Sequence, residues 1–329
     1  MNPKSPSPLS SPTREGEGTL PSTSSPTREG GGTLPSTSSP TREGGGLSPS
    51  PSTSSPTRED GGSPAAHDAT SAAGDQSHSG HPLLAYRNEE FLDSPEARSL
   101  RIVSEYLYPL SHFRKEKVQD TIVFFGSART HEMGPNGRYY DDARELARRI
   151  TEWSDHLPHH SRRFVVCSGG GPGIMEAANR GAQDAGGKTI GLNIGLPFEQ
   201  RPNPFITPEL CFEFHYFFMR KFWFAYLAKG LVVFPGGFGT LDELTEILTL
   251  MQTQKLLKRM PIILYGTAFW KEIINFDALV KHGMIAESDL NLFSFADDVD
   301  TAFKKLVDGL TKFWLEPGPD VPAIAKTQV

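Results

Sequence analysis

A short apolar run that leads into a glycine-rich turn limits how this chain can fold more than any other stretch. Residues 231–234, Leu-Val-Val-Phe, have the length and composition of a buried strand. The turn at residues 235–239 holds three glycines, which let the backbone approach a ligand closely. A helical pattern of apolar residues begins at Thr240. A strand, a glycine turn and a helix start together point free backbone N–H groups at an anion, and phosphate is the anion that this geometry favours.

Two polar residues at this helix start have both a structural and a functional interpretation. Thr240 is able either to cap the helix or to bind a phosphate oxygen. Glu243 is able to complete a capping box with Thr240. For Glu243 taken alone, this structural role is the favoured one, because acidic residues are common in a first helical turn.

The complete string favours a functional role instead. The pattern Pro-Gly-Gly-x-Gly-Thr-x-x-Glu, which runs from Pro235 to Glu243, resembles the signature of the LOG ("lonely guy") family. These proteins are cytokinin-activating phosphoribohydrolases, with bacterial relatives often described as lysine decarboxylase-like. The resemblance implies a LOG-type, Rossmann-like fold.

The composition disfavours several other classes of protein. The chain of 329 residues has a net charge of −6 and no long basic run, which disfavours a nucleic-acid partner. No apolar run approaches the length of a membrane span, and no hydrophobic signal core is found at the N-terminus. The two cysteines, Cys167 and Cys211, lie in apolar or aromatic surroundings without metal-ligand spacing. We therefore expect a cytoplasmic protein with no membrane partner.

Residues 1–82 form a low-complexity tail in which the unit Ser-Pro-Thr-Arg-Glu recurs, beginning at Ser11, Ser25, Ser39 and Ser55. The repeats hold almost no apolar residues, so they are expected to be disordered rather than packed as a solenoid. Two alternatives stay open: a docking or phosphorylated tail, and a mis-assigned start codon.

After this tail, the sequence predicts a helical arm and then an α/β domain. Residues 83–119 form the arm, whose amphipathic helix is expected to end at Pro109. In residues 120–316, short apolar strands alternate with helices, which predicts a doubly wound parallel sheet with right-handed crossovers. Residues 317–329 form a proline-rich tail. The expected strands lie at residues 121–125, 164–167, 189–193, 231–234, 261–265 and 291–295, and the expected helices after residue 240 and at 139–153, 217–227, 268–281 and 298–314.

Two further turns are expected at the carboxyl edge of the sheet, where open parallel sheets bind ligands. Gly126 and Ser127 follow the first strand, and LOG-like proteins have a similar turn there. A glycine-rich turn at residues 168–175 is a second candidate anion cradle. It is neither a P-loop nor a dinucleotide fingerprint. The LOG resemblance extends to it through a Gly-Gly-Gly-x-x-Gly-x-Met spacing, with Gly173 one position early.

The helix predicted at residues 217–227 is apolar nearly all round and is expected to be buried. Arg220 and Lys221 are costly there unless they meet an anion. Either both lie on a solvated stripe or extend outward to water, or Arg220 faces a bound phosphate or the Glu243 carboxylate. LOG-like proteins have an Arg-Lys pair at this place. Here Phe217 takes the position of a methionine, and Met219 replaces a residue that is often glutamate.

The resemblance implies hydrolysis of the N-glycosidic bond of AMP or a related cytokinin nucleotide, with Arg220 and Glu243 as the catalytic pair. No metal or cofactor is required, and a homodimer or larger homo-oligomer is expected. The expected substrate-binding residues are Gly126, Ser127, Ser168, Gly169, Gly170, Gly171, Lys221, Pro235, Gly236, Gly237, Phe238, Gly239, Thr240 and Thr249.

The main alternative is a non-catalytic nucleotide or molybdenum-cofactor carrier, since carriers of that cofactor resemble this fold and share its glycine turns. Arg220 and Glu243 together favour catalysis. Lysine decarboxylation is disfavoured because no pyridoxal-phosphate lysine motif is recognisable. An NAD-dependent activity is disfavoured because the dinucleotide fingerprint is missing.

Overall fold

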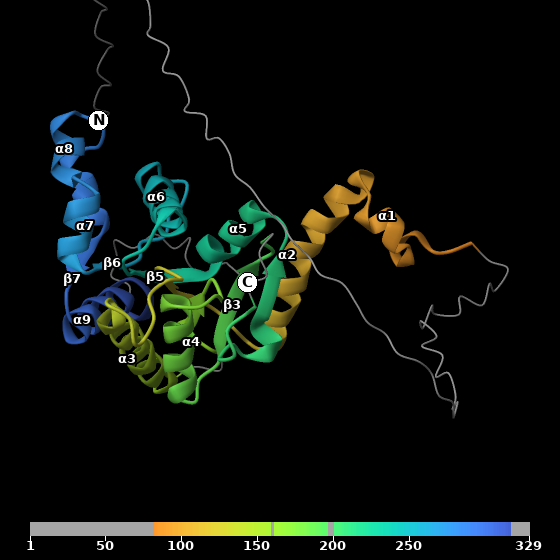
Figure 1. Ribbon diagram of the computed structural model, residues 1–329, viewed down its shortest axis with the longest axis horizontal. Helices are drawn as coiled ribbons and strands as arrows, with labels where there is room; N and C mark the ends of the chain where they lie inside the picture. The colour runs from red at the N-terminus through yellow and green to blue at the C-terminus, as the bar shows by residue number, and fades with distance from the viewer. Residues whose placement is uncertain (1–81, 159–160, 197–200, 317–329) are drawn as a thin grey trace, which may run out of the picture. The chain divides into compact units, whose positions relative to one another are not determined.

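The computed structural model describes residues 82–158, 161–196 and 201–316 (Figure 1). All of them belong to one compact unit, Ser77–Val329. The two predicted tails, apart from Pro82, lie outside the described residues.

The described residues form a seven-stranded sheet in which all pairings are parallel, with the strand order β4-β3-β2-β1-β5-β6-β7. The chain builds outward from β1 to β4 and then returns to the other side of β1 with β5, so the order reverses between β1 and β5. The predicted doubly wound α/β fold is confirmed. The strands are β1 (Thr121–Phe125), β2 (Val165–Ser168), β3 (Thr189–Ile194), β4 (Cys211–Phe214), β5 (Ala228–Val233), β6 (Ile262–Tyr265) and β7 (Ser294–Ala296).

The helices cover both faces of the sheet (Figure 1). They are α1 (Glu89–Asp93), α2 (Arg98–Lys115), α3 (Gly137–Asp155), α4 (Ile174–Asp184), α5 (Phe217–Leu227), α6 (Phe238–Gln252), α7 (Thr267–Ile273), α8 (Phe276–Lys281) and α9 (Val299–Leu310), which continues into a π-helical turn at Thr311–Leu315. Single 3-10 turns lie at Ala85–Arg87, Pro95–Ala97, Pro208–Leu210 and Glu287–Leu292. No helix of the described chain is long and apolar enough to cross a membrane.

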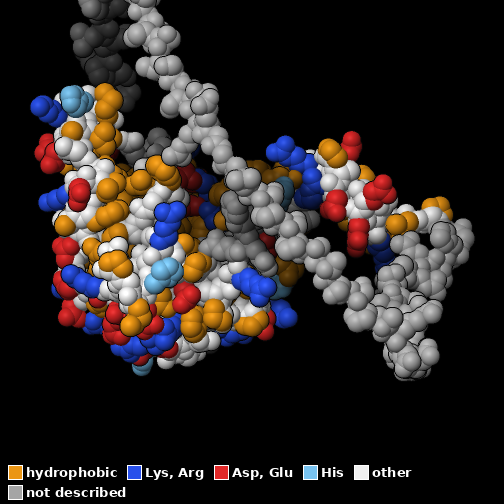
Figure 2. Space-filling view, in the orientation of Figure 1, with side chains coloured by type: hydrophobic (Ala, Val, Ile, Leu, Met, Phe, Trp, Pro, Cys, Tyr) orange, Lys and Arg blue, Asp and Glu red, His pale blue; other side chains and the backbone are white. Residues whose placement is uncertain are grey.

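Successive side chains of a strand point to opposite faces of the sheet, so the hydrophobic core has two parts, one on each face. On β1, Ile122 and Phe124 pack with α3, α4 and α9, whereas Val123 and Phe125 pack with α2, α5 and α6. Each strand is therefore buried on both sides, which explains why the central strands read as unbroken apolar runs. On the face that Figure 2 shows, acidic and basic side chains are intermixed over α3 and α4, and several of them pair, as Arg144 does with Asp184.

The arm helix does not end at Pro109, as the sequence predicted. Helix α2 continues to Lys115 with Pro109 inside it. A proline has no N–H to donate to the carbonyl four residues earlier, which here belongs to Glu105. That carbonyl accepts a hydrogen bond from Trp223 Nε1 of α5 at 3.0 Å instead. A contact from another helix thus satisfies the group that the proline leaves free.

Helix α5 is less buried than its composition predicted. Phe217, Phe218 and Phe222 are 50%, 49% and 37% exposed. Only the stripe of Met219, Trp223, Phe224 and Leu227 is buried, because the sheet and α2 cover one side of this helix.

Several element boundaries also differ from the prediction. Residues 211–214, to which the sequence assigned no element, form the edge strand β4. The single helix expected at residues 268–281 is two helices, since the Asn275 side chain accepts from Ala278 N and starts α8 anew. The last strand is shifted to Ser294–Ala296 behind a 3-10 turn.

Candidate functional site

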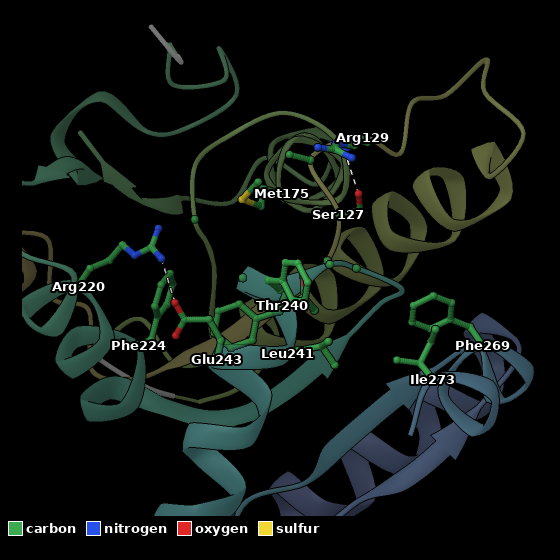
Figure 3. A pocket seen from close by; sticks show the side chains of 18 residues that line it. Ser127, Arg129, Met175, Arg220, Phe224, Thr240, Leu241, Glu243, Phe269 and Ile273 are labelled. Atoms are coloured by element: carbon green, nitrogen blue, oxygen red, sulfur yellow. Dashed lines mark hydrogen bonds and ion pairs between the residues drawn. The ribbon is translucent and has the colours of Figure 1, made fainter. Parts of the chain in front are cut away.

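A cavity of about 750 Å³ opens at the carboxyl ends of β1, β2 and β5 (Figure 3). This position is the switch point of the sheet, where the strand order reverses. The lining residues are Phe125, Gly126, Ser127, Ala128, Arg129, Gly169, Met175, Arg220, Phe224, Gly236, Gly237, Phe238, Gly239, Thr240, Leu241, Glu243, Phe269 and Ile273.

The turn after β1 is tied to the turn after β5. Ser127 N donates to the Pro235 carbonyl at 3.0 Å. Gly126 packs so closely on α4 that a Cβ there would lie 2.7 Å from Ile174 side-chain atoms. Ser127 Oγ accepts from Arg129 N at 3.0 Å, which shapes the loop at the cavity rim.

The turn after β2 is held by buried polar side chains. Ser168 Oγ donates to Asn179 Oδ1 at 2.7 Å and accepts from Gly170 N at 3.0 Å. The Asn203 amide donates to the carbonyls of Gly170 and Gly171, each at 3.1 Å. Of the predicted residues 168–171, Gly169 alone is among those that line the cavity. The others shape the turn.

The turn after β5 leads directly into α6, whose first residue is Phe238. No side chain caps this helix, and Gly237 is its N-cap residue. The capping box between Thr240 and Glu243 is therefore not formed, because the helix begins before Thr240 rather than at it. Hydrogen bonding in α6 begins with Leu241, whose N–H donates to the Gly237 carbonyl at 3.0 Å. The N–H groups of the residues before it lie at the helix start, where intrahelical acceptors are lacking. These residues, Phe238, Gly239 and Thr240, line the cavity.

The side chains of Arg220 and Glu243 meet at one wall of the cavity. Arg220 Nη2 on α5 donates to Glu243 Oε1 on α6 at 2.9 Å (Figure 3). Glu243 is 5% exposed, and the Arg220 side chain is 14% exposed. The guanidinium also lies over the rings of Phe217 and Phe224, at 5.1 and 5.6 Å from their centroids. Arg220 Nε is buried without a hydrogen-bond partner among the described residues.

Lys221 follows Arg220 but points elsewhere. Its Nζ pairs with Asp242 Oδ2 at 2.7 Å and with Glu246 Oε2 at 3.0 Å. Both carboxylates belong to α6, so the two cations bind the same helix at different points. Burial opposes the charge of Lys221, but its hydrogen bonds to Asp242 and Glu246 outweigh this effect and raise its pKa. Lys221 is not among the residues that line the cavity.

Burial sets the electrostatics of the Arg220–Glu243 pair. It raises the pKa of the Glu243 carboxyl, and the charges of Arg220 and Lys221 offset part of that rise. Burial likewise lowers the pKa of Arg220, and Glu243 opposes the shift. The ordinary pKa of an arginine lies far above neutral pH, so the guanidinium keeps its charge. The cavity wall therefore holds a fixed cation beside a carboxylate of increased basicity.

The structure brings together many, but not all, of the predicted site residues. Those outside the cavity lining are Ser168, Gly170, Gly171, Lys221, Pro235 and Thr249. Thr249 is exposed on α6. Sequence reasoning missed Phe269 and Ile273, which α7 places opposite Arg220 in Figure 3. An ordinary apolar helix gave no local signal for them. Within the described residues, no group of three or more His, Cys, Asp or Glu side chains is placed to hold a metal.

The fold and the cavity define an all-parallel α/β protein with a cavity at the switch point of its sheet. A family model described as "Possible lysine decarboxylase" matches residues 175–306. A curated relative, cytokinin riboside 5'-monophosphate phosphoribohydrolase LOG of Oryza sativa subsp. japonica, is 29% identical over 178 residues. That alignment covers 53% of this chain and 66% of the rice protein, just under two thirds.

A second curated relative, cytokinin riboside 5'-monophosphate phosphoribohydrolase LOG3 of Arabidopsis thaliana, is 26% identical over 59% of this chain and 84% of its own. The resemblance to the LOG family that residues 235–243 predicted is confirmed. Among solved structures, the molybdenum cofactor carrier protein of Chlamydomonas reinhardtii is similar, at 22% identity over 59% of this chain and 99% of that chain, with a TM-score of 0.39.

Proposed function

We propose that the protein is a nucleoside 5′-monophosphate phosphoribohydrolase. It would hydrolyse the N-glycosidic bond of AMP or a related cytokinin nucleotide, releasing the free base and ribose 5-phosphate. The observation that carries this proposal is the buried contact of 2.9 Å between Arg220 and Glu243 at the wall of the cavity. The names of the curated relatives support the same reaction class.

The glycine turn before α6 supplies the phosphate end of the site. Gly236, Gly237, Phe238, Gly239 and Thr240 all line the cavity. Backbone N–H groups at a helix start, with the positive end of the helix dipole, suit a 5′-phosphate. The phosphate would fix the ribose within reach of Glu243, which lies in the same helix.

Glu243 supplies the carboxylate that the chemistry needs. Cleavage of the bond between C1′ and the base nitrogen leaves positive charge on the ribose, in an oxocarbenium-like transition state. A carboxylate stabilises this charge and accepts a proton as water adds to C1′. A pKa raised by burial makes Glu243 a stronger base than an exposed glutamate.

Arg220 supplies the compensating positive charge. The electron pair of the broken bond moves to the base, and a guanidinium nearby stabilises that developing negative charge. The proton taken from water then completes the free base. Arg220 also keeps Glu243 ionised through their hydrogen bond. One cation thus acts on both the leaving group and the carboxylate.

The test is direct. The purified chain is incubated with AMP, CMP, GMP and isopentenyladenosine monophosphate, and the products are separated by chromatography. Release of free base by the wild type, and its loss in Glu243→Gln and Arg220→Ala variants that remain folded, is the expected result. Glu246→Gln is the matched control, since it makes the same change one turn further along α6, outside the cavity lining. Tight nucleotide or molybdenum-cofactor binding without turnover would contradict hydrolysis and support the carrier alternative.

We also propose that the chain forms a homodimer or larger homo-oligomer. Leu100, Val103 and Leu107 recur at helical spacing on α2 and are each about half exposed. Phe218 and Phe222 of α5 are exposed as well, and Phe222 contacts Tyr106 of α2 with ring centroids 5.7 Å apart. Light scattering on the wild type and on Val103→Glu tests this proposal, and a monomeric wild type would exclude it. A cytoplasmic location stays a prediction.

A further inference from the structure

Glu105 lies on arm helix α2, outside the cavity and before the region that the family model matches. Its carboxylate accepts two backbone hydrogen bonds at the start of α5: from His215 N at 2.7 Å and from Tyr216 N at 3.3 Å. Tyr216 is the N-cap residue of α5 and offers no side-chain cap of its own. The Glu105 carboxylate therefore binds the N–H groups of the N-cap residue and of the residue before it, as the acid of a capping box does for the N-cap N–H, and its charge suits the positive end of the helix dipole.

The backbone of the same residue holds α5 at a second point. The Glu105 carbonyl accepts from Trp223 Nε1 at 3.0 Å. This acceptor is available because Pro109 has no N–H to donate to it. Trp223 is 1% exposed, and Tyr106 stacks on it with ring centroids 5.6 Å apart. The contact is thus buried and has little room to shift.

The two contact points bracket Arg220. Arg220 N donates to the carbonyl of Tyr216 at 3.2 Å, so Arg220 follows the first turn of α5 directly. Trp223 follows Arg220 by less than one turn. A helix held on both sides of one residue has little freedom to rotate about its axis or to slide along it. These contacts hold the backbone from which the Arg220 side chain reaches Glu243.

We propose that Glu105 is a positioning residue for Arg220, which makes the arm a working part of the site. The kinetic part of this inference rests on the proposed hydrolase function, whereas its structural part does not. Without the Glu105 carboxylate, the start of α5 is free to loosen, and the guanidinium moves relative to Glu243. Small displacements of catalytic groups reduce rates strongly.

The test compares Glu105→Gln with Glu96→Gln in the full chain. Glutamine keeps one acceptor oxygen but places an NH₂ group against a backbone N–H, so the variant is expected to fold with a weaker hold on the backbone at the start of α5. Glu96 is exposed on the same arm, and its side chain has no hydrogen bond or ion pair within the described part of the chain, so it provides a matched acid-to-amide control. We expect kcat to fall by a factor on the order of 10 to 100 in Glu105→Gln, with a smaller change in KM. Glu96→Gln should match the wild type.

A second background separates positioning from general loss of stability. If Glu105 acts through Arg220, adding Glu105→Gln to an Arg220→Ala chain should not lower its residual rate further, measured in single-turnover reactions with excess enzyme well below the unfolding temperature. Multiplicative losses would overturn the proposal, because they would show that Glu105 acts independently of Arg220. An unchanged kcat in the single variant, with an active wild type, would overturn it as well.

A structural readout stays available if the wild type hydrolyses none of the nucleotides. Hydrogen exchange of the α5 amides should become faster in Glu105→Gln and stay unchanged in Glu96→Gln. A crystal structure of Glu105→Gln should show the Arg220–Glu243 contact lengthened beyond 2.9 Å. An inactive wild type with these changes would refute the hydrolase while leaving the positioning role intact. Unchanged exchange together with an unchanged contact would refute the positioning role alone.

Discussion

Gly236 and Thr240 pack so closely that a methyl group does not fit between them: a Cβ at position 236 would lie 2.1 Å from the Thr240 hydroxyl oxygen. A Cβ added to the next residue, Gly237, would have no atom within 4 Å, and the φ of −92° there suits any residue. The first glycine of the turn is therefore required by packing. The second is required only if a ligand approaches the backbone closely.

The variants Gly236→Ala and Gly237→Ala should separate these two requirements. We expect Gly236→Ala to lower the free energy of unfolding by about 1–3 kcal/mol, as overpacking does. Gly237→Ala should cost about 1 kcal/mol or less, because alanine is a poorer N-cap residue than glycine, yet it should raise KM, because Gly237 lines the cavity. Urea denaturation and initial-rate kinetics measure both quantities. A Gly237→Ala enzyme with normal KM would show that no ligand contacts this backbone.

The acid side of the pH profile should report the environment of Glu243. Burial raises the pKa of this carboxyl above its ordinary value of 4.5. As the pH decreases, kcat/KM should therefore fall with a midpoint above pH 4.5. Of the charged groups around it, Arg220 and Lys221 lower the pKa, whereas Glu246 and Asp242 raise it. Lys221→Met should therefore shift the midpoint to higher pH, and Glu246→Gln should shift it to lower pH.

These two substitutions lie outside the cavity lining and form an opposed pair. Profiles of kcat/KM measured from pH 4 to pH 8 would detect the shifts. Two shifts in the same direction would mean that Glu243 is not the group whose ionisation limits the rate.

The buried ion pair between Asp120 and Arg163 should contribute to the stability of the fold and not to activity. Asp120 is fully buried just before β1, at the amino ends of the strands, whereas the cavity lies at their carboxyl ends. Its carboxylate accepts from Arg163 Nε at 2.6 Å and from Phe164 N at 2.5 Å. Asp120→Ala leaves both donors without this partner, and we expect a loss of about 3–5 kcal/mol in the free energy of unfolding.

The control is Asp300→Ala, which removes an exposed pair with Arg149 and should cost about 1 kcal/mol or less. Thermal denaturation measures both variants. At a temperature where Asp120→Ala is folded, its kcat/KM should equal that of the wild type. A selective loss of activity would place Asp120 in the function of the site.

Phe238 should contribute to ligand binding without contributing to stability. It lines the cavity, yet its side chain is 92% exposed. We expect Phe238→Ala to change the free energy of unfolding by less than about 0.5 kcal/mol while raising KM. Met133→Ala is the comparison, since Met133 is 97% exposed and is not among the lining residues. Equal KM values for the two variants would exclude contact between Phe238 and the substrate.

The sequence by itself determined the parallel α/β architecture and the local form of the central motif. Apolar runs that are long enough for buried strands alternate with helical periodicity, and few topologies accommodate that order. The glycine-rich stretch at residues 235–239 leads from a strand into a helix, as the local pattern predicts, and the helix begins at Phe238. Local periodicity sets such features within a few neighbouring residues.

Only the tertiary structure decided which side chains meet. Arg220 and Glu243 are 23 residues apart, and their contact depends on how α5 and α6 pack beside β5. Lys221, one residue later, is rotated about 100° around the helix and pairs with Asp242 and Glu246 instead. Pro109 does not end α2. Trp223 Nε1 of α5 donates to the Glu105 carbonyl, which Pro109 leaves without a donor. Contacts between elements are decided by packing, and no local pattern encodes them.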